Sequence, residues 1–138
     1  MIELKEIIDN FEYLDDWEDR YKYIIELGNS LENFPEEYKN EKTKVSGCVS
    51  QVWISSKIIT KKNEKKISFK GDSDAHIVKG LITIVLSIYS NKTPQEILSL
   101  SGEEILKKLN LDDHLSPQRS NGLFSMLERI KNDARSNL

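Results

Sequence analysis

Cysteine is almost absent from this sequence: Cys48 is the only one among 138 residues. A single cysteine cannot form an internal disulfide. Together with the two histidines, His76 and His114, it matches none of the Cys/His spacings that are typical of zinc sites. We therefore expect no structural disulfide and no metal site, and any sulfur chemistry of the chain has to involve Cys48.

The sequence also lacks a long apolar run and an excess of positive charge. Its longest apolar run, residues 81–89, is about half of the ~20 residues that a membrane span needs. The net charge of −3 gives no general attraction to nucleic acid. The N-terminal segment, residues 1–6, has neither the basic nor the apolar part of a secretory signal. We expect a chain of the reducing cytoplasm that binds neither membrane nor nucleic acid.

The length and composition that are present predict one globular domain covering residues 1–138, with 38% hydrophobic and 31% charged residues. Apolar residues at three- and four-residue steps predict a helix from Ile2 to about Phe11. Asp15 or Asp16 could cap a second helix that ends near Gly28. The polar stretch 30–43 is expected to be an exposed connection.

Residues 51–70 have the composition of a β-hairpin, with strands at 51–60 and 66–70 and a charged turn between them. Val45 could begin a third, flanking strand. Residues 75–89 are apolar nearly all round, which predicts a central helix that Ser73 or Asp74 would cap. Gly80 inside that helix suggests that another element crosses closely there.

The C-terminal third of the sequence predicts three more helices. Capping boxes at Thr93–Glu96 and Ser101–Glu104 each start a short helix, and Ser116 with the following proline starts a last helix that runs to about Ala134. The first turn of the last helix is polar and contains Arg119. It could favour anions or a partner's carboxylates, or it could simply be solvated. The predicted class is α+β, with a small antiparallel sheet of about three strands packed against several helices.

Cys48 lies after a glycine and just before a β-branched and aromatic run, which indicates a loop tip that leads into a strand. Hydrolysis would need a histidine base, and thiol exchange would normally use a second cysteine. His76 and His114 are candidates by count alone, and no cysteine-hydrolase signature surrounds Cys48. A lone thiol without base or resolving partner fits a group carrier, but composition alone leaves a structural cysteine equally open.

Four segments, in this order and spacing, resemble the SufE family of sulfur-acceptor proteins of iron–sulfur cluster assembly. They are Ser46–Trp53, Gly71–Leu81, Thr93–Ile97 and His114–Leu123. The resemblance implies an α+β fold similar to that of the scaffold protein IscU. It also implies that the protein accepts a persulfide sulfur on Cys48 from a SufS-type cysteine desulfurase, stimulates that enzyme, and passes the sulfur to a SufBCD-type scaffold. A cluster normally needs several thiolate ligands, so the chain is not expected to be a scaffold itself.

The same resemblance implies roles for residues near Cys48. Arg119 matches an arginine that lies near the acceptor loop and contacts the desulfurase. Asp74 matches a position linked to positioning of the acceptor loop. Gln51 is expected to support the same loop. The pyridoxal phosphate belongs to the desulfurase, so no cofactor is expected in this chain, which would be an accessory protein of sulfur transfer rather than a stand-alone enzyme. One alternative is an adaptor that stimulates the desulfurase without carrying sulfur, and another is an independent thiol enzyme. We further expect Cys48 to be shielded in the free protein, because an exposed thiolate or persulfide oxidises.

Overall fold

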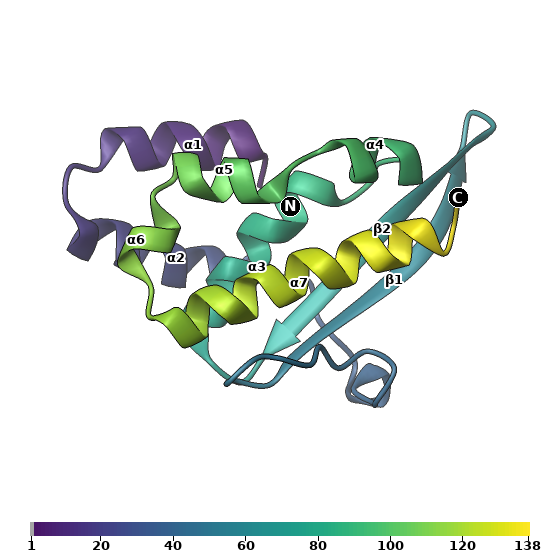
Figure 1. The fold of residues 1–138 in the computed structure, drawn as a ribbon, viewed down its shortest axis with the longest axis horizontal. Helices are drawn as coiled ribbons and strands as arrows, with labels where there is room; N and C mark the ends of the chain where they lie inside the picture. The colour runs from purple at the N-terminus through teal and green to yellow at the C-terminus, as the bar shows by residue number, and fades with distance from the viewer. Residues whose placement is uncertain (1) are drawn as a thin grey trace.

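A two-stranded antiparallel hairpin and the helices packed beside it make up the fold, which confirms the predicted α+β class (Figure 1). The computed structural model describes residues 2–138. The elements in chain order are α1 (Leu4–Tyr13), α2 (Trp17–Gly28), the 3-10 helix η1 (Glu36–Tyr38), β1 (Val52–Lys61), β2 (Glu64–Ser73), α3 (His76–Tyr89), α4 (Pro94–Ser99), α5 (Gly102–Lys108), α6 (Leu111–His114) and α7 (Pro117–Arg135). Among residues 2–138, no helix is both long and apolar enough to cross a membrane.

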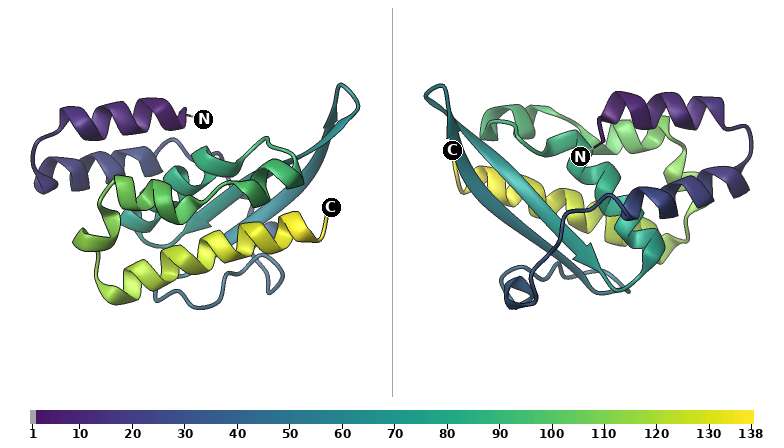
Figure 2. Two further views of the ribbon diagram at one scale, coloured as in Figure 1. Left: turned by 45° about the horizontal axis from the view of Figure 1, so that its top comes forward. Right: turned by 180° about the vertical axis from the view of Figure 1, so that it is seen from behind.

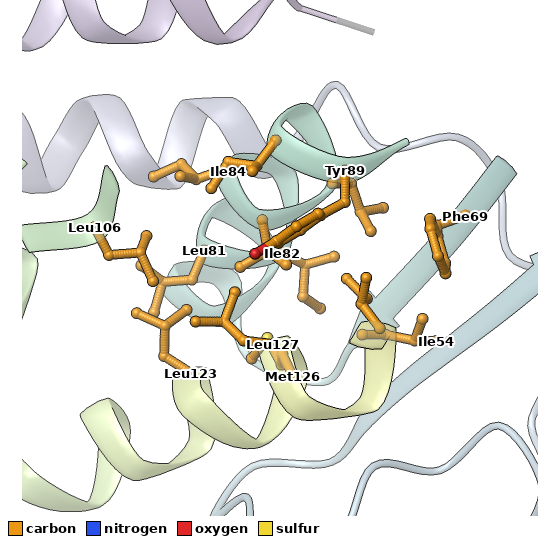
Figure 3. Close-up of a cluster of buried hydrophobic side chains, with 14 of the residues drawn as sticks. Ile54, Phe69, Leu81, Ile82, Ile84, Tyr89, Leu106, Leu123, Met126 and Leu127 are labelled. Carbon is orange, nitrogen blue, oxygen red and sulfur yellow. The ribbon is translucent and has the colours of Figure 1, made fainter. Parts of the chain in front are cut away.

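Helix α3 is the centre of the core, and its apolar surface is covered from several sides (Figures 2 and 3). Leu81, Ile82 and Ile84 are completely buried. Helix α2 crosses α3 at Gly80, where a Cβ atom would collide with the carbonyl oxygen of Ile24. The close crossing predicted from this glycine is therefore confirmed. Ile97 of α4 and Leu106 of α5 belong to the same core.

The hairpin pairs Val52 with Ser73 at its base and Lys61 with Glu64 at its tip. Lys62 and Asn63 form the two-residue turn with φ angles of 51° and 66°, as tight hairpin turns require. The second strand continues three residues beyond the predicted end at 70. The third strand predicted at Val45 is wrong: Lys44 makes only an isolated bridge to Trp53, because the chain turns away at Gly47 with φ +88°.

Of the caps predicted for α2 and α3, the first is confirmed and the second is wrong. Asp16 caps α2 as expected, and its side chain accepts from the Asp19 N–H at 2.8 Å. Neither Ser73 nor Asp74 caps α3, since Ala75 occupies the N-cap position. The Ser73 hydroxyl accepts from the Ala75 N–H instead, and the Asp74 carboxylate is used by the neighbouring loop.

Near the C-terminus, Thr93 and Glu96 form the complete capping box that the sequence predicts. Ser101 caps α5, because its hydroxyl accepts from the Glu104 N–H at 3.3 Å. The same hydroxyl donates to the Glu103 carboxylate. The predicted second box is therefore only half formed, with the serine half present. The single-turn helix α6 has no counterpart among the predicted elements. The connection 30–43 is not wholly exposed either, because Phe34 is buried and η1 follows it.

Gly80→Ala is expected to lower the free energy of unfolding by about 2–3 kcal/mol, because overpacking at a rigid helix crossing forces backbone to move. Ser87→Ala in the same helix is the matched control, since Ser87 bonds only the carbonyl of Ile84 in its own helix. It should change stability by no more than about 0.5 kcal/mol. Urea unfolding measures the free energy of unfolding of both variants. A loss below about 1 kcal/mol in Gly80→Ala would contradict the rigid crossing.

Candidate functional site

The loop that carries Cys48 comprises residues 46–51 and is closed at its base by two short backbone segments. The Val45 N–H donates to the Val52 carbonyl at 2.9 Å, and the Ile54 N–H donates to the Thr43 carbonyl at 2.8 Å. Residues 43–45 therefore lie antiparallel to the start of β1. We call residues 46–51 the cysteine loop and residues 42–45 its leading arm. The ends of the loop are held together by the chain itself.

Helix α7 forms the floor under the cysteine loop. Gly47, with φ +88°, lies so close to Ser125 that a Cβ atom would approach the hydroxyl to 2.6 Å. Cys48 lies against Gly122, and its thiol donates to the Gly122 carbonyl at 3.6 Å. A Cβ atom at Gly122 would stand 3.5 Å from the Cys48 sulfur. Cys48 therefore packs directly against the backbone of α7, at a distance where a Cβ on Gly122 would still be in ordinary contact.

A cavity of about 380 Å³ opens beside the thiol. It lies between the cysteine loop, the start of α3 and the start of α7. Most of its exposed lining is apolar, and Arg119 belongs to its polar part. The lining residues are Cys48, Val49, Ser50, Val52, Val78, Leu81, Ser116, Gln118, Arg119, Gly122 and Met126. A cavity with an apolar wall and a few polar groups is the usual form of a small binding site.

Cys48 is partly buried, whereas the next residue, Val49, is 81% exposed. Burial raises the pKa of the Cys48 thiol, because a thiolate loses solvation there. No neighbouring charge offsets this shift. The thiol form is therefore favoured in the free protein, and the sulfur is not activated as a nucleophile in this conformation.

Arg119 lines the same cavity as Cys48. Its Nη1 atom is buried and has no hydrogen-bond acceptor among residues 2–138. A buried guanidinium N–H without an acceptor costs free energy, so this side chain favours an acceptor brought by a partner or a ligand. The backbone N–H of Arg119 is already used, because it donates to the Ser116 hydroxyl that caps α7.

Asp74 and Gln51 meet at the far end of the cysteine loop. The Asp74 carboxylate accepts from the Gln51 backbone N–H at 3.1 Å. This bond ties the last residue of the loop to the turn before α3. Asp74 does not line the cavity. Its carboxylate contacts the backbone of the loop and not the space beside the sulfur.

Neither histidine lies in the cavity with Cys48. His114 stacks on Trp17 with ring centroids 3.8 Å apart, and His76 is exposed at the start of α3. The arrangement does not provide the cysteine–histidine pair that a hydrolase needs. No group of three or more His, Cys, Asp or Glu residues that could hold a metal ion occurs within residues 2–138.

Sequence reasoning missed the face of α7 that carries the loop. Ser125, which touches Gly47, and Arg129, which hydrogen-bonds to the leading arm, were not singled out. Their signal was present, since Gly122, Ser125 and Arg129 recur at steps of three and four and so share one side of a helix. Nothing in the sequence, however, indicated that the cysteine loop would lie on that side.

Comparison with known proteins identifies the family. The family model of the SufE Fe-S metabolism associated domain matches residues 5–134. An uncharacterised SufE-like protein of Rhizobium etli is 50% identical over 135 residues, covering 98% of this chain and 91% of that protein. Another from Rhizobium meliloti is 47% identical over 138 residues, covering 100% and 99%.

A solved structure supports the same fold. The solution structure of a hypothetical protein from Thermus thermophilus matches with a TM-score of 0.74 and 18% identity, covering 99% of this chain and 98% of that one. At this identity the match concerns the fold alone. The family match and the two rhizobial relatives together cover nearly the whole chain. The chain belongs to the SufE family, whose domain is associated with iron–sulfur metabolism.

Proposed function

We propose that this protein is a persulfide carrier of iron–sulfur metabolism. It accepts sulfur on Cys48 from a SufS-type pyridoxal-phosphate cysteine desulfurase, stimulates that enzyme, and delivers the sulfur to a SufBCD-type scaffold. The observation that carries the proposal is the setting of Cys48: the only thiol of the chain lies on a loop at a cavity, without a histidine or a second cysteine beside it. Membership of the SufE family supports the same role.

The transfer is a displacement at sulfur. The Cys48 thiolate attacks the terminal sulfur of the desulfurase's cysteine persulfide, a new S–S bond forms on Cys48, and the bond to the desulfurase cysteine breaks. That cysteine leaves as a thiolate, and the proton lost from Cys48 can return to it. No electrons are gained or lost overall, so no external oxidant or reductant is needed. One thiol is sufficient for both receipt and delivery.

The surroundings of the Cys48 thiol have to change before it can take part in sulfur transfer. In the free protein Cys48 is partly buried and its pKa is raised, so binding of the desulfurase has to bring the loop outward or lower that pKa. We assign Asp74 and Gln51 to supporting the acceptor loop, because their hydrogen bond holds its end. We assign Arg119 to the partner contact, since it lines the cavity that Cys48 also lines and one of its buried donors has no acceptor among residues 2–138.

An adaptor that stimulates the desulfurase by surface contact alone is the second candidate. Val49 is 81% exposed at the tip of the cysteine loop and could bind a partner without any transfer of sulfur. The two functions differ in whether they need the sulfur atom of Cys48. Variants of that residue therefore separate them.

Incubation with a SufS-type desulfurase and free cysteine should add ~32 Da, the mass of one sulfur atom, to the wild-type protein at Cys48. Cys48→Ser should gain no such mass and should lose stimulation of the desulfurase, because an alcohol is a far weaker nucleophile than a thiolate. Intact-protein mass spectrometry and a sulfide-release assay measure the two effects. Full stimulation by Cys48→Ser would support the adaptor instead.

The pH dependence of alkylation should show the raised pKa of Cys48. The iodoacetamide reaction requires the thiolate, so its rate in the free, folded protein should reach half-maximum at a higher pH than in a peptide of residues 44–52. Because the folded pKa lies above the unfolded one, burial of this thiol stabilises the protein below the unfolded pKa. That contribution is lost as pH rises through the folded pKa. A midpoint below that of the peptide would show an activated thiol and contradict the burial effect.

Asp74→Ala should make Cys48 react about threefold to tenfold faster with iodoacetamide, since the loop loses the hydrogen bond that a charged acceptor makes to the Gln51 N–H. Asp74→Asn is the matched control, because its side-chain oxygen can still accept from that N–H. It should react at nearly the wild-type rate. Equal rates in all three proteins would show that this bond does not hold the loop.

A further inference from the structure

We propose that Arg129 is a positioning residue that holds both sides of the cysteine loop against α7 and thereby sets how accessible Cys48 is to a partner. The proposal concerns the regulation of the same site, so its functional meaning rests on the proposed sulfur transfer. Its structural content does not, because thiol accessibility can be measured without a desulfurase.

The guanidinium of Arg129 joins the two sides of the loop. Its Nη2 atom donates to the carbonyl of Lys42 at 2.7 Å, in the leading arm, and to the carbonyl of Ile54 at 3.1 Å, in β1. Its Nη1 atom donates to the carbonyls of Thr43 and Lys44, both at 3.4 Å. One side chain of α7 therefore bonds backbone before and after the cysteine loop.

Asp133 fixes the orientation of this guanidinium. The Arg129 Nε atom donates to the two carboxylate oxygens of Asp133 at 3.2 and 3.3 Å, one helical turn further along α7. The side chains are only 22% and 19% exposed, so water screens the pair less than it screens a surface ion pair. With Nε bound to Asp133, the two terminal nitrogens are directed at the loop. A lysine has one nitrogen and cannot reproduce this planar arrangement.

Besides Arg129, the leading arm is held by Val45, which is 5% exposed and belongs to the core, and by its pairing with β1. It does not extend the sheet as a third strand, and its pairing with β1 consists of the two backbone bonds across the base of the loop. Arg129 lies on the α7 face that also carries Gly122 under Cys48 and Ser125 under Gly47. Loss of Arg129 would leave the base of the loop joined by its own two backbone bonds and by Val45, but without the bonds that tie Lys42, Thr43, Lys44 and Ile54 to α7. The sulfur would then leave the side of Gly122 more often.

The test is the rate at which iodoacetamide alkylates Cys48 in the full chain, without a partner, at a temperature where every variant is folded. Arg129→Ala should react about tenfold faster than wild type, as expected when hydrogen bonds from a charged group are lost. Arg129→Lys should fall between the two. Arg135→Ala is the matched control: it removes a positive charge from the same helix, but Arg135 pairs with the exposed Glu128 at 3.1 Å and does not touch the loop. It should react at the wild-type rate.

A second control separates positioning from general destabilisation. The Tyr89 hydroxyl accepts from the Gly102 N–H at 2.7 Å and donates to the Leu100 carbonyl at 3.0 Å, far from the loop in the chain. Tyr89→Phe should therefore lower stability without raising the alkylation rate. Hydrogen exchange in Arg129→Ala should speed up in residues 42–54 and not in α2 or α3.

Alkylation of Arg129→Ala within twofold of wild type would overturn the proposal, and so would an equal acceleration in Tyr89→Phe. These outcomes are independent of the persulfide assay. If wild-type Cys48 fails to gain sulfur while Arg129→Ala is alkylated faster, the proposed function fails and the role of Arg129 stands. If Cys48 gains sulfur while Arg129→Ala and wild type are alkylated at equal rates, the proposed function stands and the role of Arg129 fails.

Discussion

Burial of α3 on nearly all sides is the constraint on which the other elements depend. A helix that is apolar around its circumference has to be covered by neighbours, and here α2, α7 and the hairpin cover it. The absence of a side chain at Gly80 lets the backbone of α2 approach closely. Since α7 and β1 both pack on this core, their mutual position is determined. The cysteine loop connects to β1 and lies on α7, so it inherits that geometry (Figure 1).

The site combines a restrained loop with a thiol that is not activated. The loop is held at Gln51 by Asp74, at its tip by Gly122 and Ser125, and at its base by Arg129. Each restraint is a hydrogen bond or a close backbone contact, and none is a large apolar interface. Such restraints are individually weak compared with the core, so the loop can move while α3 and its neighbours stay in place. The proposed carrier function, which requires the sulfur to be protected and then presented, would benefit from this separation.

The electrostatic state of the thiol agrees with this division. Burial raises the pKa of Cys48, and no cation within residues 2–138 offsets this shift. In the proposed function, reactivity then depends on the partner, whose binding would change the surroundings of the sulfur. Arg119 adds a second feature that a partner would complete, because one of its buried donors has no acceptor within residues 2–138.

The sequence by itself determined the local features: the α+β class, the hairpin, the central helix, the caps at Thr93 and Ser116, and the position of the only cysteine. These follow from hydrophobic period, turn chemistry and the count of one cysteine, all of which are written over short spans of chain. Only the tertiary structure decided that the third strand is absent, that Asp74 bonds Gln51 instead of capping α3, and that Gly122 and Arg129 face the loop. These contacts join residues 23 to 87 positions apart. They depend on how the elements pack around α3, and no local pattern records that packing.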